Sequence, residues 1–164
     1  MKMKVLHQNA LLLGMMTLLL SAPVLAYDKN DEQVIQQDIA KMHDAMKKQN
    51  GQVFVDMMPE PILKQMAKSL GMNLADTKAL LAGMASGMSG TDVQFRANLA
   101  KIKVYQSKTK RDYVFIPTTT TMDGVAVEGK MFGVKDNGKW SYITWQDRYK
   151  KWVKIAYPDI QKLP

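Results

Sequence analysis

Methionines and a histidine are the first residues of this chain whose types and spacing suit a particular chemistry. Met42 and Met46 lie four residues apart with His43 between them, and Met84 and Met88 repeat the spacing. Residues four apart share one face of a helix, and thioether sulfur with imidazole suits Cu(I). Methionine also fills irregular gaps in a core. We favour the core, and keep a metal site at Met42, His43 and Met46 as the alternative.

Aromatic side chains in the C-terminal half form a second candidate site. The candidates are Tyr113, Phe115, Phe132, Trp140, Tyr142 and Trp145. Side chains alternate between the two faces of a strand, so Trp140 and Tyr142 should share one face while Trp145 lies on the other. Aromatic walls with a few polar groups are typical of small-molecule pockets. We therefore treat these six as candidate pocket residues for a small apolar ligand, with core filling as the alternative.

Nucleophilic or acid–base catalysis has little support in the sequence. His43 is the only histidine after residue 26, and the adjacent Asp44 points elsewhere on a helix. The chain contains no cysteine and no G-x-S-x-G, H-E-x-x-H or P-loop motif. These observations favour a binding protein over an enzyme, and we expect no cofactor.

Three helical stretches are expected before residue 90. The first spans 30–50, where apolar residues recur at helical spacing. The second spans 52–71 and is restarted by two prolines, and the third spans 73–88. The residues on the apolar face of the first helix are Ile35, Ile39, Met42 and Met46.

Strands are expected after residue 92, because β-branched and aromatic residues alternate there. The expected strands cover 93–104, with a bulge near Ala100, then 113–122, 125–134 and 140–145, and a short helix is expected over 149–156. Asp123-Gly124 and Asp136-Asn137-Gly138 are hairpin signals. Pro117 predicts an edge or a bulge at its position, because proline cannot donate to a sheet. Helices followed by an antiparallel sheet predict an α+β fold.

These segments together resemble the NTF2-like (cystatin-like α+β) superfamily, and in particular small exported bacterial domains of that fold with unknown function. The resemblance is carried by FVDMMPEPILKQM (54–66), YVFIPTTTTM (113–122), DNGKWSYITW (136–145) and the closing residues 155–160 with Leu163 and Pro164. It implies N-terminal helices packed on a curved antiparallel sheet that wraps a long helix into a cone.

The resemblance also raises an enzymatic alternative. Ketosteroid isomerase, in the wider superfamily, uses an Asp base with Tyr or Asp hydrogen-bond donors inside the cone. No such motif matches this chain residue by residue. An enzyme of this type would need one of the strand-region carboxylates to be buried beside Tyr113 or Tyr142. Those carboxylates are Asp112, Asp123, Glu128 and Asp147.

Residues 1–26 are predicted to be a cleaved secretory signal peptide. Lys2 and Lys4 precede an apolar run, and Val24-Leu25-Ala26 suits a signal-peptidase site. The alternative is a transmembrane anchor, but the apolar stretch is at the lower limit for spanning ~30 Å of hydrocarbon. We expect a single domain over 27–164, exported to the periplasm or beyond, with no stable membrane anchor after cleavage.

The chain is basic, with a net charge of +8, and loss of Lys2 and Lys4 leaves +6 from 21 basic and 15 acidic residues. An exported basic surface suits an anionic envelope polymer or an envelope protein, although lysines also serve solubility alone. Nucleic acid is not an expected partner in this compartment. Gly83 and Gly87 lie four apart and predict close helix contact, either internal or across a homodimer.

Overall fold

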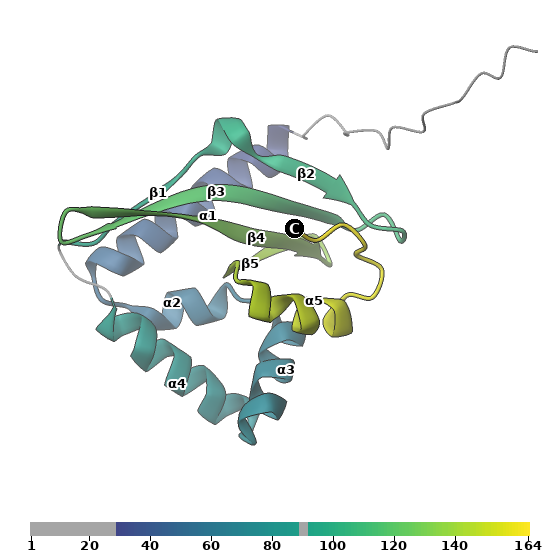
Figure 1. The fold of residues 1–164 in the computed structure, drawn as a ribbon, viewed down its shortest axis with the longest axis horizontal. Helices are drawn as coiled ribbons and strands as arrows, with labels where there is room; N and C mark the ends of the chain where they lie inside the picture. The colour runs from purple at the N-terminus through teal and green to yellow at the C-terminus, as the bar shows by residue number, and fades with distance from the viewer. Residues whose placement is uncertain (1–28, 89–91) are drawn as a thin grey trace, which may run out of the picture.

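The computed structural model describes residues 29–88 and 92–164. The predicted signal segment lies outside this part of the chain. Within these described residues, four α-helices precede an antiparallel sheet and a fifth helix follows it. The α+β prediction is therefore confirmed, and the sheet is curled, with helices against both of its faces (Figure 1).

The N-terminal helices are α1 (Lys29–Lys47), α2 (Gly51–Asp56), α3 (Glu60–Leu70) and α4 (Leu74–Gly87). The predicted second helix is divided into α2 and α3, and Pro61 lies in the first turn of α3, where a proline is well tolerated. Gly71 ends α3 in the left-handed conformation at φ 65°. Asn73 caps α4 by accepting a hydrogen bond from the Asp76 backbone N–H at 2.8 Å.

The five strands are β1 (Gln94–Ala97), β2 (Lys103–Gln106), β3 (Asp112–Met122), β4 (Val125–Asp136) and β5 (Lys139–Thr144). The last three form a meander, and β1 and β2 both pair with β3 along the same edge. Asp123 and Gly124 connect β3 to β4 with positive φ angles of 50° and 77°. This is the geometry of the two-residue hairpin turns that the sequence predicts there.

The predicted strand over 93–104 is interrupted rather than bulged. A 3-10 turn at Leu99–Lys101 separates β1 from β2 and accounts for the change in alternation. Pro117 lies inside β3, opposite this interruption, and its carbonyl accepts a hydrogen bond from the Asn98 N–H at 2.8 Å. The Pro117 nitrogen, which carries no hydrogen, faces the same side, so no hydrogen bond to β4 is lost. The prediction of an edge or a bulge at Pro117 is therefore wrong: β3 is paired on both sides and its register with β4 is continuous, and the proline is tolerated because the neighbouring strand is interrupted opposite it.

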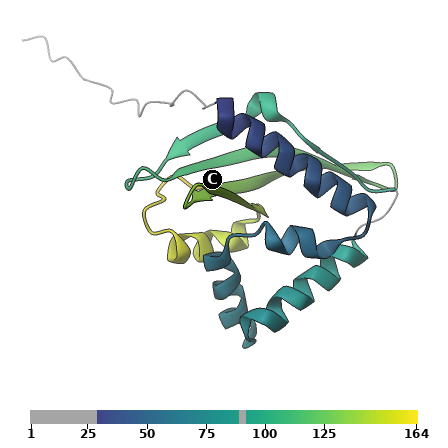
Figure 2. The ribbon, with the colours of Figure 1, turned by 180° about the vertical axis from the view of Figure 1, so that it is seen from behind.

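Helices cover both faces of the sheet. Helix α1 packs on one face through Ile35 and Met42 (Figure 2). Helix α3 and the C-terminal helix α5 (Lys150–Ala156) pack on the other, around Leu63 and Val153. Among the residues that the structure describes, no helix is both long enough and apolar enough to cross a membrane.

Candidate functional site

The face of the sheet that carries α3 and α5 holds a cluster of five aromatic rings. Its members are Tyr105, Tyr113, Phe115, Phe132 and Trp145. Tyr105 stacks on Tyr113 with ring centres 5.2 Å apart, and Phe115 contacts Trp145 edge-on at 5.3 Å. Such ring pairs add stability beyond the area that they bury. Four of the six predicted pocket residues therefore meet on one face.

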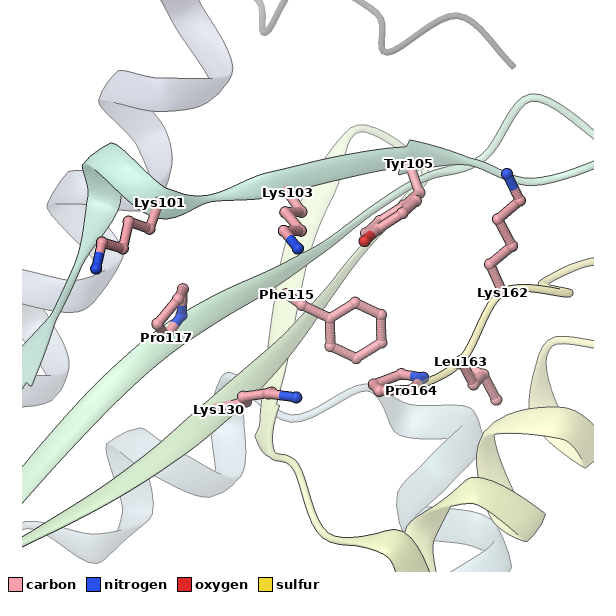
Figure 3. Close-up of a pocket in the computed structure, with 9 residues that line it drawn as sticks. All are labelled: Lys101, Lys103, Tyr105, Phe115, Pro117, Lys130, Lys162, Leu163 and Pro164. Carbon is pink, nitrogen blue, oxygen red and sulfur yellow. The ribbon is translucent and has the colours of Figure 1, made fainter. Parts of the chain in front are cut away.

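An open groove of about 350 Å³ runs along the exposed side of this cluster (Figure 3). Tyr105, Phe115 and Pro117 form its floor, and Leu163 and Pro164 form a wall at one end. The volume is at the lower end of the range for small-molecule sites. The floor is apolar and is built on β2 and β3, so a rigid sheet positions it.

The C-terminal segment, residues 157–164, is held by hydrogen bonds to the sheet and to α5. The buried Tyr113 hydroxyl donates to the Lys162 carbonyl at 3.2 Å, and Lys150 Nζ donates to the Pro164 oxygen at 2.6 Å. Burial raises the pKa of Tyr113 above its ordinary value. The groove wall is thus attached at two points close to the site.

A second set of contacts fixes the start of this segment at Asp159. Thr109 donates to the Asp159 carboxylate at 2.7 Å and Arg111 does so at 3.2 Å. Burial alone would raise the pKa of Asp159, but hydrogen bonds from Ser107, Thr109 and Arg111 outweigh it and lower the pKa to about 2. Arg111 also pairs with Asp136 and lies over the Tyr157 ring at 5.0 Å.

In the part of the chain that the structure describes, the charged side chains that line the groove are all lysines. They are Lys101, Lys103, Lys130 and Lys162, and all four are exposed. Lys103 pairs in register with Phe115 on one side of β3, and Lys130 pairs with Pro117 on the other. The apolar floor therefore lies between two lysines that come from different neighbouring strands.

Trp140 and Tyr142 lie on the opposite face of the sheet, as the alternation predicts, and face α1. The indole N–H of Trp140 donates to the buried Asp31 at 2.9 Å, and Lys135 donates to the same carboxylate at 2.7 Å. Tyr142 donates its hydroxyl to Asp38 at 3.1 Å. These two aromatic residues attach α1 to the sheet and do not line the groove.

The three residues of the copper alternative do not share one exposed surface. Met42 is buried against the sheet with 4% of its surface exposed, and Met46 and His43 are half-buried. The alternative required accessible, converging sulfurs, and the side chain of Met42 does not meet that requirement. Within residues 29–88 and 92–164, no group of three or more His, Cys, Asp or Glu side chains could hold a metal ion.

The carboxylates on which the isomerase alternative depends are not buried beside a tyrosine. Asp123, Glu128 and Asp147 are exposed, and Asp112 is half-buried and accepts from Gln106 at 3.2 Å. Glu128 accepts from Thr119 at 2.9 Å. The carboxylate that Tyr142 contacts is that of Asp38 in α1, which is not one of these four residues.

Helix α4 exposes the two glycines for which a helix contact was expected. A Cβ atom added at Gly83 or Gly87 would have no neighbour within 4 Å in the described part of the chain. Leu80 and Met84 are also exposed on this helix, as is Met88 directly after it. The internal-packing interpretation therefore has no support, and the homodimer stays a prediction.

Sequence reasoning missed Tyr105, Pro117 and the C-terminal residues as parts of the site. Alternation does carry a signal for Tyr105. Val104 packs on the face of the sheet that α1 covers, so its neighbours Lys103 and Tyr105 must both face the other side. No local pattern places Leu163 beside Phe115, because their contact joins segments that are far apart in the chain.

Comparisons with known proteins do not extend this description. No protein-family model, no curated protein and no solved structure matches the chain. The functional conclusion therefore rests on the groove itself.

Proposed function

We propose that this protein is a non-enzymatic binding protein that holds a small ligand with an apolar body in the groove above Phe115 and Pro117. The supporting observation is the apolar floor, which the fold leaves open beside an otherwise closed aromatic cluster. Ligand sites in proteins usually combine such a floor with a few polar groups at the rim. The site holds no buried carboxylate or other base, so binding fits it better than catalysis.

A neutral fluorescent probe tests this function. N-phenyl-1-naphthylamine has an apolar aromatic body and no charge, and its emission rises on transfer to an apolar site. We expect it to bind the wild type with a micromolar dissociation constant and to bind Tyr105→Ala at least about fivefold more weakly, a loss of about 1 kcal/mol that matches the removal of one ring contact.

Tyr149→Ala is the matched control. Tyr149 stacks on Trp152 with ring centres 5.1 Å apart, much as Tyr105 stacks on Tyr113, but it lies outside the groove. Circular dichroism of each variant checks that the fold is intact. No probe binding by a folded wild type, or equal loss in both variants, would reject the proposed function.

We also propose that the curled sheet and α1 form an NTF2-like cone and that the protein is exported. The cone is supported by α1 lying along one face of a curled antiparallel sheet, and export is supported by the sequence pattern of residues 1–26. The intact mass of the protein from the exported fraction tests the second point. A mass beginning near Tyr27 is expected, whereas a mass beginning at Met1 would contradict cleavage.

A further inference from the structure

The charged side chains that line the groove are all of one sign. Four of the nine residues that line it are lysines, and none is an acid. The nearest carboxylate on the same face of β4 belongs to Glu128, two residues before Lys130, and it already accepts a hydrogen bond from Thr119. Like charges gathered at one site repel each other and attract an anion from solution.

Among the described residues, no carboxylate neutralises these lysines, whereas some other cations of the molecule are neutralised in ion pairs. Arg111, Lys135 and Lys64 each form an ion pair with a carboxylate. The ammonium groups of Lys101, Lys103, Lys130 and Lys162 make no ion pair or hydrogen bond with any residue in the described part of the chain. Their charge is therefore available to a ligand.

The sheet register sets where an anion would be held. Lys103 and Lys130 flank β3 on the same face, two strand spacings apart and offset by two residues, which places their backbones about 12 Å apart. Lysine side chains are long and flexible, so both ammonium groups can reach one group above β3. Figure 3 shows the Phe115 ring and Pro117 between these two lysines, with Lys162 at the end formed by the C-terminal segment.

Resting on the proposed function, we infer that the ligand is an anionic amphiphile. Its apolar body lies on Phe115 and Pro117, and its carboxylate, sulfonate or phosphate group is bound between Lys103 and Lys130. The apolar floor excludes a bare inorganic anion as the preferred ligand, because such an ion gains nothing from aromatic surface. The lysines in turn favour the charged amphiphile over a neutral one.

Two probes that differ by a single group test this inference. 8-Anilino-1-naphthalenesulfonate is N-phenyl-1-naphthylamine with one added sulfonate. The double variant Lys103→Gln/Lys130→Gln should weaken binding of the sulfonate probe about tenfold, which corresponds to about 1.4 kcal/mol, and change binding of the neutral probe less than twofold. Raising NaCl from 20 to 500 mM should weaken binding of the sulfonate probe severalfold, because salt screens exposed charges. Binding of the neutral probe should hardly change.

The control is Lys48→Gln, which removes one charge in the turn after α1, away from the groove. This variant should leave binding of both probes unchanged. The inference would be overturned if Lys48→Gln weakened binding of the sulfonate probe as much as Lys103→Gln or Lys130→Gln alone, because each removes one charge and the loss would then reflect net charge. The inference would also be overturned if the neutral probe bound but the lysine substitutions did not affect binding of the sulfonate probe. The proposed function would stand in that case.

Competition identifies the natural head group and excludes a polymer. Dodecanoate or dodecyl phosphate should displace the sulfonate probe at concentrations at least about tenfold below those of inorganic phosphate, and the better of the two indicates the carboxylate or the phosphate source. Displacement by dextran sulfate with none by either amphiphile would reject the amphiphile and favour an anionic envelope polymer.

Discussion

Asp31 shows how one side chain joins two distant parts of the molecule. Its carboxylate is 8% exposed and accepts hydrogen bonds from the Trp140 indole and from Lys135, more than 100 positions away in the chain. Charged groups that are buried in this way stabilise a fold only while all partners are present. The same position also lies in the first turn of α1, where a negative charge is favourable.

Removal of this carboxylate should destabilise the protein more than its position on the helix suggests. Asp31→Ala leaves a buried indole N–H without its acceptor and a partly buried ammonium without its partner, so we expect a loss of about 2 kcal/mol in the free energy of unfolding. Urea unfolding followed by tryptophan fluorescence measures it. Glu32→Ala, in the same helical turn, should lose no more than about 0.5 kcal/mol. Equal losses would show that only the helix terminus matters.

At the scale of elements, α2 and α4 pack so closely that a glycine is required between them. A Cβ atom at Gly51 would overlap the Ala82 carbonyl and lie 2.7 Å from the Ser86 nitrogen. The Gly51 N–H also donates to the Ser86 hydroxyl at 2.9 Å. Because backbone atoms cannot move aside as side chains do, α2 and α4 would have to separate to admit a methyl group.

Alanine at two glycines should therefore have opposite effects. Gly51→Ala should lower the free energy of unfolding by about 2–3 kcal/mol, in the range of core overpacking. Gly83→Ala, inside α4 with open space around it, should raise it by about 0.5–1 kcal/mol because alanine favours the helix. Thermal unfolding by circular dichroism compares the two variants. A stabilising Gly51→Ala would mean that α2 and α4 are not in this contact.

Most elements follow from local sequence, whereas the groove does not. Helical spacing, proline restarts and Asp-Gly turns predict α1 through α4 and the β3–β4 hairpin, because each depends on residues close in the chain. The change in alternation near Ala100 also marks a real interruption, although a 3-10 turn makes it. The groove needs residues 162–164 to cross the sheet, and no periodicity contains that long-range contact.

At the scale of the whole molecule, the C-terminal segment makes stability sensitive to acid. The folded pKa of Asp159 is about 2, below its ordinary value of 3.8. Its stabilising contribution is therefore complete above pH 4 and is lost as the pH falls through 2, because the unfolded chain binds the proton more readily. After allowance for solvent screening, the contribution is about 1 kcal/mol.

Asp159→Asn should remove this contribution. The difference in free energy of unfolding between wild type and variant should fall from about 1 kcal/mol at pH 6 to near zero at pH 2. Urea titrations at a series of pH values measure the difference. Asp123→Asn, in an exposed turn with positive φ that asparagine tolerates, should show no such trend. If the difference in free energy of unfolding between wild type and Asp159→Asn did not change with pH, the low pKa of Asp159 in the folded protein would be contradicted.

The interruption between β1 and β2 has a consequence for behaviour at high concentration. A sheet with a long free edge invites a second chain to add a strand, which begins aggregation. Here one edge is divided by the turn at Leu99–Lys101 and carries exposed lysines, and the other is engaged where the Tyr142 N–H donates to the Met57 carbonyl at 2.7 Å. The interrupted β1–β2 edge and β5 are therefore poor templates for an added strand, whereas residues 125–129 of β4 lie beyond the end of β5 and are exposed, so this short stretch is where a second chain would add if any did.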